Sequence, residues 1–230
     1  MKKFRLTDII PLYAVPPLVW ELVWNTIVYN GVRFINSGRE HVIMELPIDG
    51  AIPLICPSIV IYFGCFVFWG INYILGARQE KAEVMRFLSA DFMAKTVCLV
   101  IFLIIPTTNI RPEITDTGFF GRLMTFLYTI DPADNLFPSI HCLTSWFCFI
   151  AVRKNKKLPA AYKVFSLVAA LAVFVSTLTT KQHVFADVIA GFAIAELCYH
   201  ITELTGFRRL YTRVFSHLPV CRELKQTEKK

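Results

Sequence analysis

The sequence predicts an all-α, polytopic membrane protein, a bundle of about six transmembrane helices, and three observations lead to this fold class. Hydrophobic residues make up 55% of the 230 residues and the mean hydropathy is +0.53, an apolar content above that of ordinary soluble domains. Apolar runs near the roughly 20 residues that a membrane-spanning helix needs recur along the chain. Lys and Arg gather in alternate segments between those runs, as expected of a chain that crosses a bilayer repeatedly.

The apolar runs differ in how closely they match a spanning helix. The second, fifth and sixth are clear candidates. Prolines, Glu21 and Asn25 interrupt the first, and the fourth is short enough to be a buried helix. In chain order, the candidate spans are Ile10–Val28, Ile52–Leu75, Asp91–Pro106, Phe137–Val152, Leu158–Leu178 and Val184–Ile201.

The distribution of positive charge predicts the orientation of the bundle. With the N-terminus inside, the inner segments carry 17 of the 24 Lys and Arg residues, the outer segments carry five, and two lie within spans. Cytoplasmic loops are enriched in Lys and Arg, so both termini are expected in the cytoplasm. The N-terminus shows no small-residue cleavage site and is not expected to be a removable signal peptide. Short loops favour a bacterial plasma membrane as the location.

Two shorter segments have the pattern of helices that lie at a membrane surface. From Phe207 to Leu218, apolar residues recur at helical spacing opposite three arginines, which indicates an amphipathic helix on the anionic inner leaflet. Phe119–Ile130 has a similar pattern on the outer side. We therefore expect a transmembrane domain over residues 1–206 and a basic amphipathic cytoplasmic tail over residues 207–230.

Charge and cysteine content exclude two other classes of protein. The net charge of +7 is dispersed between apolar runs, unlike the basic patch of a nucleic-acid-binding protein. The seven cysteines fall mostly within apolar runs and lack close paired spacing. They are therefore interpreted as small hydrophobic residues and not as a disulfide framework or a metal site.

The predicted orientation brings several polar residues to one edge of the membrane. Arg111 follows the third span, Ser139 and His141 open the fourth, and Lys181 and His183 open the sixth. All of them lie at the outer edge. The ends of three helices are therefore expected to converge on one shallow site on the extracytoplasmic side.

His183, Asp187 and His141 have the residue types that nucleophilic catalysis requires. His183 and Asp187 are four residues apart and therefore share one face of a helix. A carboxylate bonded to one imidazole nitrogen fixes the tautomer and makes the other nitrogen more nucleophilic. His141 is placed to donate a proton to a leaving oxygen.

Arg111, Ser139 and Lys181 are candidate anion ligands. Arg111 offers a planar fork for phosphate oxygens and Lys181 a mobile point charge. Ser139 lies at a helix start, where backbone N–H groups and the helix dipole attract anions. A single interfacial His or a Pro-Ser helix cap is usually structural. The combination on one side favours metal-independent phosphoryl transfer.

These residues resemble the motifs of the type-2 phosphatidic acid phosphatase superfamily of integral-membrane lipid phosphatases. "PSIH" from Pro138 is similar to the family's Pro-Ser-Gly-His element, with Ile140 in place of Gly. "STLTTKQHVFAD" from Ser176 to Asp187 resembles the Ser-Arg…His-x-x-x-Asp element at the family spacing. Arg111-Pro112 matches the end of the Lys…Arg-Pro element. The resemblance extends from about Ile52 to Ile201.

The resemblance implies a role for each site residue. His183 would be the nucleophile that forms a phospho-histidine, Asp187 its orienting partner, and His141 the acid and then the base. Arg111 and Ser139 would hold the phosphate of a membrane lipid. No metal or other cofactor is implied, and the site would face the cell exterior, the periplasm or an organelle lumen.

Two cations of the family pattern are missing from this chain. The family Lys falls at Ile104, and the family Arg of the third element falls at Thr177. Lys181, two residues before the candidate nucleophile, is a hypothetical replacement for one of them. Altered cation sets also occur in branches similar to sphingolipid and inositol-phosphorylceramide synthases.

Several functions therefore stay open at this point. The first is a phosphatase that hydrolyses a lipid phosphomonoester or diphosphate. The second is a phosphotransferase that moves a phospho-headgroup to a lipid alcohol. A third is a non-enzymatic transporter or scaffold, which the one-sided clustering disfavours. A fourth is a zinc hydrolase that uses His141, His183 and Asp187 as ligands.

Overall fold

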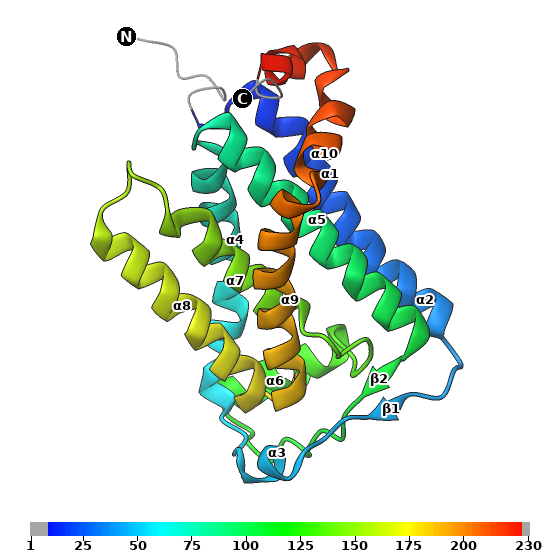
Figure 1. Ribbon diagram of the computed structural model, residues 1–230. Coiled ribbons are helices and arrows are strands. Elements are labelled where there is room, and N and C mark those ends of the chain that lie inside the picture. The colour runs from blue at the N-terminus through cyan, green and yellow to red at the C-terminus, as the bar shows by residue number, and fades with distance from the viewer. Residues whose placement is uncertain (1–8, 227–230) are drawn as a thin grey trace.

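The computed structural model describes residues 9–226, and Figure 1 shows them as a bundle of helices. Five of the basic residues that entered the charge count lie outside the described residues, namely Lys2, Lys3, Arg5, Lys229 and Lys230. In order, the elements are α1 (Val15–Thr26), a π-helical turn (Ile27–Gly31), α2 (Val32–Asn36), β1 (Val42–Ile43), α3 (Pro47–Ala51), α4 (Ile59–Ala77), α5 (Lys81–Ile104), β2 (Thr107–Thr108), α6 (Phe119–Ile130), α7 (Ile140–Arg153), α8 (Ala160–Thr179), α9 (Phe185–Leu204) and α10 (Phe207–Ser216), with 3₁₀ turns at Leu12–Ala14, Cys56–Ser58 and Pro219–Gln226.

The described residues include four helices long and apolar enough to cross a membrane: α4 with the turn before it, α5, α8 and α9. They overlap the second, third, fifth and sixth predicted spans. α6 and α7 are shorter apolar helices. The largely helical fold predicted from the sequence is confirmed, and four of its spans have helices of sufficient length.

α5 begins ten residues earlier than predicted. The span was expected to start at Asp91, with Lys81 and Arg86 in a cytoplasmic loop, but both lie within the helix. No Gly or Pro interrupts the segment from Lys81 to Asp91. The Arg86 guanidinium lies over the ring of Tyr199 in α9, 4.1 Å from its centroid. The charged first turns of α5 therefore pack against protein and extend the helix beyond its apolar part.

α7 lies at the centre of the bundle and is its most enclosed helix. It packs against α4, α8 and α9, and twelve of its fourteen residues are buried. A hydrogen bond from the indole of Trp69 in α4 to Ser145 Oγ, 2.8 Å long, joins two of these helices. This central helix of fourteen residues therefore places its N-terminus inside the end of the bundle at which α9 begins.

A charged cluster joins α1 to α5 in the apolar interior. Lys95 Nζ lies 2.8 Å from Asp91 Oδ2 and 3.9 Å from Glu21 Oε2, and all three side chains are buried. The hydroxyls of Tyr73 and Tyr211 donate to Asp91 and Glu21, respectively. Tyr211 belongs to α10, so this cluster also fixes the last helix to the bundle.

Candidate active site

The starts of α7 and α9 meet at the lower end of the bundle in Figure 1. The N–H of Ser139, the residue before α7, donates to the carbonyl of Asp187 in the first turn of α9, 3.0 Å away. Gly191 allows this approach, because a Cβ added there would lie 2.5 Å from the Ser139 carbonyl oxygen. The two helices that carry His141 and His183 are therefore in backbone contact near the histidines.

His183 and Asp187 form a buried pair. Nδ1 of His183 lies 3.1 Å from Oδ2 of Asp187, which also accepts from the Val184 N–H at 3.0 Å. His183 is 7% exposed and Asp187 fully buried. A carboxylate oxygen accepts, so the imidazole proton is on Nδ1 and the lone pair is on Nε2. The sequence spacing of four predicted this contact, and the resulting tautomer is the one that a nucleophilic imidazole requires.

His141 lies beside His183. Their ring centroids are 5.7 Å apart with an angle of 57° between the ring planes. On its other sides His141 contacts Tyr62, at 4.7 Å between centroids, and Trp69, at 5.5 Å. A pocket of about 270 Å³ borders His141, and aromatic and apolar side chains of α4 and α6 form much of its lining, together with Arg33 and Asp131. One face of His141 is thus turned to the second imidazole and another to this pocket.

Arg111 is held at the same end by three contacts. Its Nη1 donates to the Asp131 carbonyl at 2.7 Å, its Nη2 donates to Gln182 Oε1 at 2.6 Å, and its guanidinium lies over the Tyr128 ring. Burial lowers the pKa of Arg111, although nearby Asp131 opposes this shift. Nε of Arg111 and Nε2 of Gln182 are buried without a hydrogen-bond partner among the described residues. Two donors, one of them on Gln182 directly before His183, are therefore without a partner within residues 9–226.

Ser139 and Lys181 are engaged in contacts within the protein. Ser139 is the N-cap of α7, and its Oγ accepts from the Cys142 N–H at 3.2 Å. Lys181 is in the left-handed region, with φ of 55°, and its ammonium donates to the carbonyls of Asp49 and Ile52 at 2.9 and 2.5 Å. The ammonium proposed as a replacement cation is thus bound to the loop that precedes α4.

Asp131 was not identified from the sequence and organises the His141 side of the site. Its carboxylate accepts from the hydroxyls of Tyr29 and Tyr62 and pairs with Arg33. Burial alone would raise its pKa, but His141 and the two hydroxyls outweigh burial and lower the pKa below the ordinary value. Asp131 lies in a loop of mixed composition without periodicity, so no sequence signal marked it.

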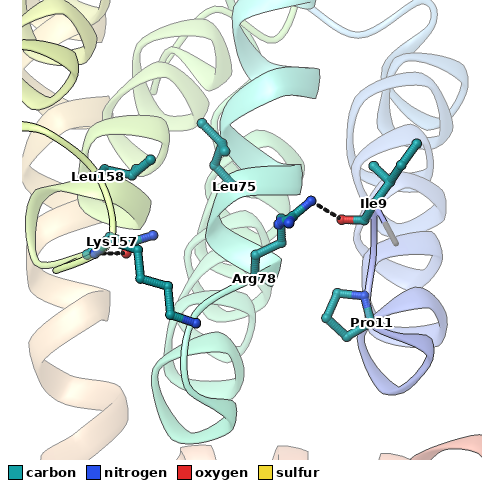
Figure 2. A pocket seen from close by; sticks show the side chains of 7 residues that line it. Ile9, Pro11, Leu75, Arg78, Lys157 and Leu158 are labelled. Carbon is teal, nitrogen blue, oxygen red and sulfur yellow. Dashed lines mark hydrogen bonds between the residues drawn. The ribbon is translucent and has the colours of Figure 1, made fainter. Parts of the chain in front are cut away.

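Pocket size alone would have pointed to the opposite end of the molecule. A pocket of about 440 Å³ lies there between α4, the loop after α7 and the segment before α1. Figure 2 shows Arg78 at this pocket, with its guanidinium directed to the Ile9 carbonyl, 3.2 Å away. The paired histidines lie at the other end of the bundle, and the chemistry of the side chains therefore identifies the candidate site.

Comparison with known families gives one match. A sequence model described as the PAP2 superfamily matches residues 96–209, a range that contains both histidines, Asp187 and Arg111. The chain belongs to the PAP2 superfamily. This result confirms the resemblance inferred from the sequence motifs. Neither the curated proteins nor the solved structures gave a match.

PAP2 membership supports enzymatic activity on phosphate esters, since the superfamily comprises phosphatases and phosphotransferases. The PAP2 family and the long apolar helices together indicate an integral membrane protein. Within residues 9–226, no group of three or more His, Cys, Asp or Glu side chains is placed to hold a metal ion.

The positions that lack the PAP2 cations have other structural roles here. Ile104 is the last residue of α5 and is 67% exposed. Thr177 is fully buried in α8, and its carbonyl accepts from the N–H groups of Gln182 and His183 at 3.0 and 3.1 Å. The backbone carbonyl of Thr177 thus helps to fix the turn that carries His183.

Proposed function

We propose that this PAP2 protein is a metal-independent lipid phosphate phosphatase that acts through a phospho-histidine. The observation that carries the proposal is the buried His183–Asp187 pair with a second imidazole beside it, 5.7 Å away between ring centroids. The substrate is a membrane lipid phosphomonoester or diphosphate, and the site faces the extracytoplasmic side of what we take to be a bacterial plasma membrane.

The first step transfers the phosphoryl group to the enzyme. Nε2 of His183 attacks phosphorus, the bond from phosphorus to the lipid oxygen breaks, and His141 gives its proton to that oxygen. Asp187 accepts the Nδ1–H bond and stabilises the positive charge on the imidazole. The N–H groups of Arg111 and of the Gln182 amide that lack a partner in the described part of the chain donate to the phosphate oxygens, where charge increases in the transition state.

The second step releases phosphate. His141, now neutral, takes a proton from water, whose oxygen attacks phosphorus as the bond to Nε2 breaks. The products are inorganic phosphate and, from a phosphomonoester, the lipid alcohol or, from a diphosphate, the lipid monophosphate. Both histidines return to their starting states. The pocket beside His141 suits the apolar part of the leaving group, since Phe63, Phe66 and Trp69 of the apolar helix α4 are among its lining residues.

The same pocket supports a second candidate function, transfer of a phospho-headgroup to a lipid alcohol. It borders the residue that would act as base in the second step, and its volume of about 270 Å³ leaves room for an acceptor other than water. In that case the lipid alcohol outcompetes water for the phospho-histidine. A labelled headgroup would then appear in a new lipid with little free phosphate.

The test is an assay of the purified protein in detergent micelles with phosphatidate, phosphatidylglycerophosphate and a polyprenyl diphosphate. Free phosphate and new lipid products are measured together, with and without EDTA. We expect phosphate release that EDTA does not affect, loss of release in His183→Ala, and full release in His217→Ala, an exposed histidine at the end of α10.

Full activity in His183→Ala would refute the proposed function. Activity lost with EDTA would favour a metal hydrolase, and absence of any product with every lipid would favour a transporter or scaffold. An acid-labile phosphate label on the wild-type protein, absent from His183→Ala, would support the covalent intermediate directly.

A further inference from the structure

A distant part of the chain, residues 37–55, forms hydrogen bonds with the turn that carries His183. We call this segment the outer strap. The outer strap joins α2 to α4 and contains β1 and α3. Its β1 pairs in parallel with β2, which follows α5. Figure 1 shows α3 below the start of α9. The strap therefore passes over the outer end of the bundle, where His141 and His183 lie.

On one side of His183, the strap caps α9. Asp49 in α3 accepts from the Phe185 N–H through Oδ1 at 2.7 Å and from the Leu46 N–H through Oδ2 at 2.8 Å. Phe185 is the first residue of α9, and the N–H groups of a first helical turn have no partner within the helix. A carboxylate there makes a charge-assisted bond and favours the positive end of the helix dipole.

On the other side of His183, the strap holds Lys181. The ammonium of Lys181 donates to the carbonyls of Asp49 and Ile52, and the Lys181 carbonyl accepts from Asn109 Nδ2 at 2.9 Å. A non-glycine residue at φ of 55° is uncommon and persists where its surroundings fix it. Lys181 thus contributes to the turn through contacts with the strap.

These bonds act on the residues immediately before and after the candidate nucleophile. Phe185 is two residues after His183, Lys181 is two residues before it, and both bind Asp49. Asp49 is 8% exposed, so its bonds are largely shielded from water. Asp187, which orients the imidazole, belongs to the same first turn of α9. Moving that turn would move the nucleophile and its partner together.

We propose that Asp49 is a positioning residue for His183, with Lys181 as its tether across the turn. The inference rests on the proposed function, because it gives Asp49 the task of holding the nucleophile in line with the substrate phosphorus. Asp49 acts through the backbone of α9 and through Lys181, and it has no chemical step of its own.

The experiment compares four variants of the full chain in the micelle assay: Asp49→Ala, Asp49→Asn, Lys181→Met and Ile48→Ala. A nucleophile displaced by about 1 Å loses on the order of 100-fold in rate, so we expect kcat of Asp49→Ala to fall by about that factor. KM should change by less than about threefold, since the proposed phosphate ligands are untouched. Ile48 is 48% exposed in the same α3, and its variant should match wild type.

Two variants test the mechanism if Asp49→Ala fails to fold. Asp49→Asn keeps an acceptor oxygen for the Phe185 N–H but loses the charge, so kcat should fall by about tenfold and no more. Lys181→Met keeps the apolar stem and removes both bonds to the strap, and it should also lower kcat while sparing KM. Wild-type kcat in Asp49→Asn and Lys181→Met, or in Asp49→Ala, would overturn the inference.

The failure of this inference is distinguishable from failure of the proposed function. Inactive His183→Ala together with fully active Asp49→Ala would remove only the positioning role. Active His183→Ala would remove the function itself. A drop in kcat that disappears when rates are divided by the folded fraction, measured by size exclusion and thermal unfolding, would show that Asp49 serves stability alone.

Discussion

Gly191→Ala is the substitution whose effect on the candidate site follows most directly from the structure. A Cβ at Gly191 would lie 2.5 Å from the Ser139 carbonyl oxygen and 3.3 Å from the Leu143 nitrogen. Both contacts are backbone atoms of α7 or its cap, which cannot rotate away as the end of a side chain can. The start of α7 and the first turns of α9 must therefore separate.

The required movement is close to 1 Å, because ordinary contacts of a Cβ begin near 3.4 Å and the shortest contact here is 2.5 Å. Overpacking of this kind typically costs about 1–3 kcal/mol of stability. In an unobstructed helix the same change stabilises by up to about 1 kcal/mol, because Ala has the higher helix propensity. The separation of α7 from α9 also moves His141 relative to His183, and a displacement of about 1 Å costs on the order of 100-fold in rate.

The measurements are phosphate release in micelles and the Tm in the same detergent. Gly64→Ala in α4 is the matched control, since a Cβ there meets nothing within 4 Å. We expect Gly191→Ala to lose both stability and activity and Gly64→Ala to keep the wild-type rate at an equal or higher Tm. If Gly191→Ala retains wild-type Tm and rate, the close α7–α9 contact is not what holds the two histidines together.

Two further predictions concern charged groups outside the histidine pair. Because the pKa of Asp131 is lowered in the folded protein, its carboxylate stabilises the fold above its ordinary pKa, and this contribution is lost as pH falls through the lowered value. Asp131→Asn should therefore have a lower Tm than wild type at pH 7, and this difference in Tm should shrink towards pH 3. A difference in Tm that does not change with pH would contradict the role of the Asp131 carboxylate. Lys95→Met should cost about 3–5 kcal/mol, since it leaves Asp91 and Glu21 buried without their cation. A loss of stability no larger than that of Lys163→Met in α8, measured as Tm, would contradict the importance of the cluster.

Local patterns in the sequence predicted the parts of the site that depend on neighbouring residues. The spacing of His183 and Asp187 placed both on one helix face, and they form a hydrogen bond in the structure. The Pro-Ser pair placed a cap at the start of α7, and Ser139 is that cap. The apolar runs indicated α4, α5, α8 and α9, because length and composition alone decide whether a helix is apolar enough to span a bilayer.

Contacts between distant segments could not be predicted in the same way. Asp49 reaches Phe185 across 136 positions of sequence, in a loop whose composition gave no signal. The contacts of the Lys181 side chain could not be predicted either. A lysine next to a candidate nucleophile has the same sequence context whether it binds a phosphate or backbone carbonyls. The early start of α5 depended on the packing of Arg86 against Tyr199, which no periodicity within α5 reveals.

The two helix N-termini at the site are used differently, and this difference bears on the missing PAP2 cations. At α9, the Asp187 carboxylate accepts from the Val184 N–H and the Asp49 carboxylate accepts from the Phe185 N–H. The positive end of that helix therefore stabilises protein groups that hold the nucleophile. At α7, the Ser139 hydroxyl accepts from the Cys142 N–H, and the Ser139 N–H donates to the Asp187 carbonyl, so the start of this helix is tied to α9.

Lys181 is bound to the outer strap and is therefore not directed to the site. Among the proposed site residues, Arg111 is the cation that contacts the turn before α9, through its bond to Gln182. Its guanidinium is fixed by the Asp131 carbonyl and the Tyr128 ring, so little further ordering is needed when a phosphate binds. We infer that phosphate binding relies on the pre-oriented guanidinium of Arg111 and on the neutral amide of Gln182. Such an arrangement holds a phosphoryl group by geometry more than by net charge, and therefore depends on the backbone contacts that fix α7, α9 and the outer strap.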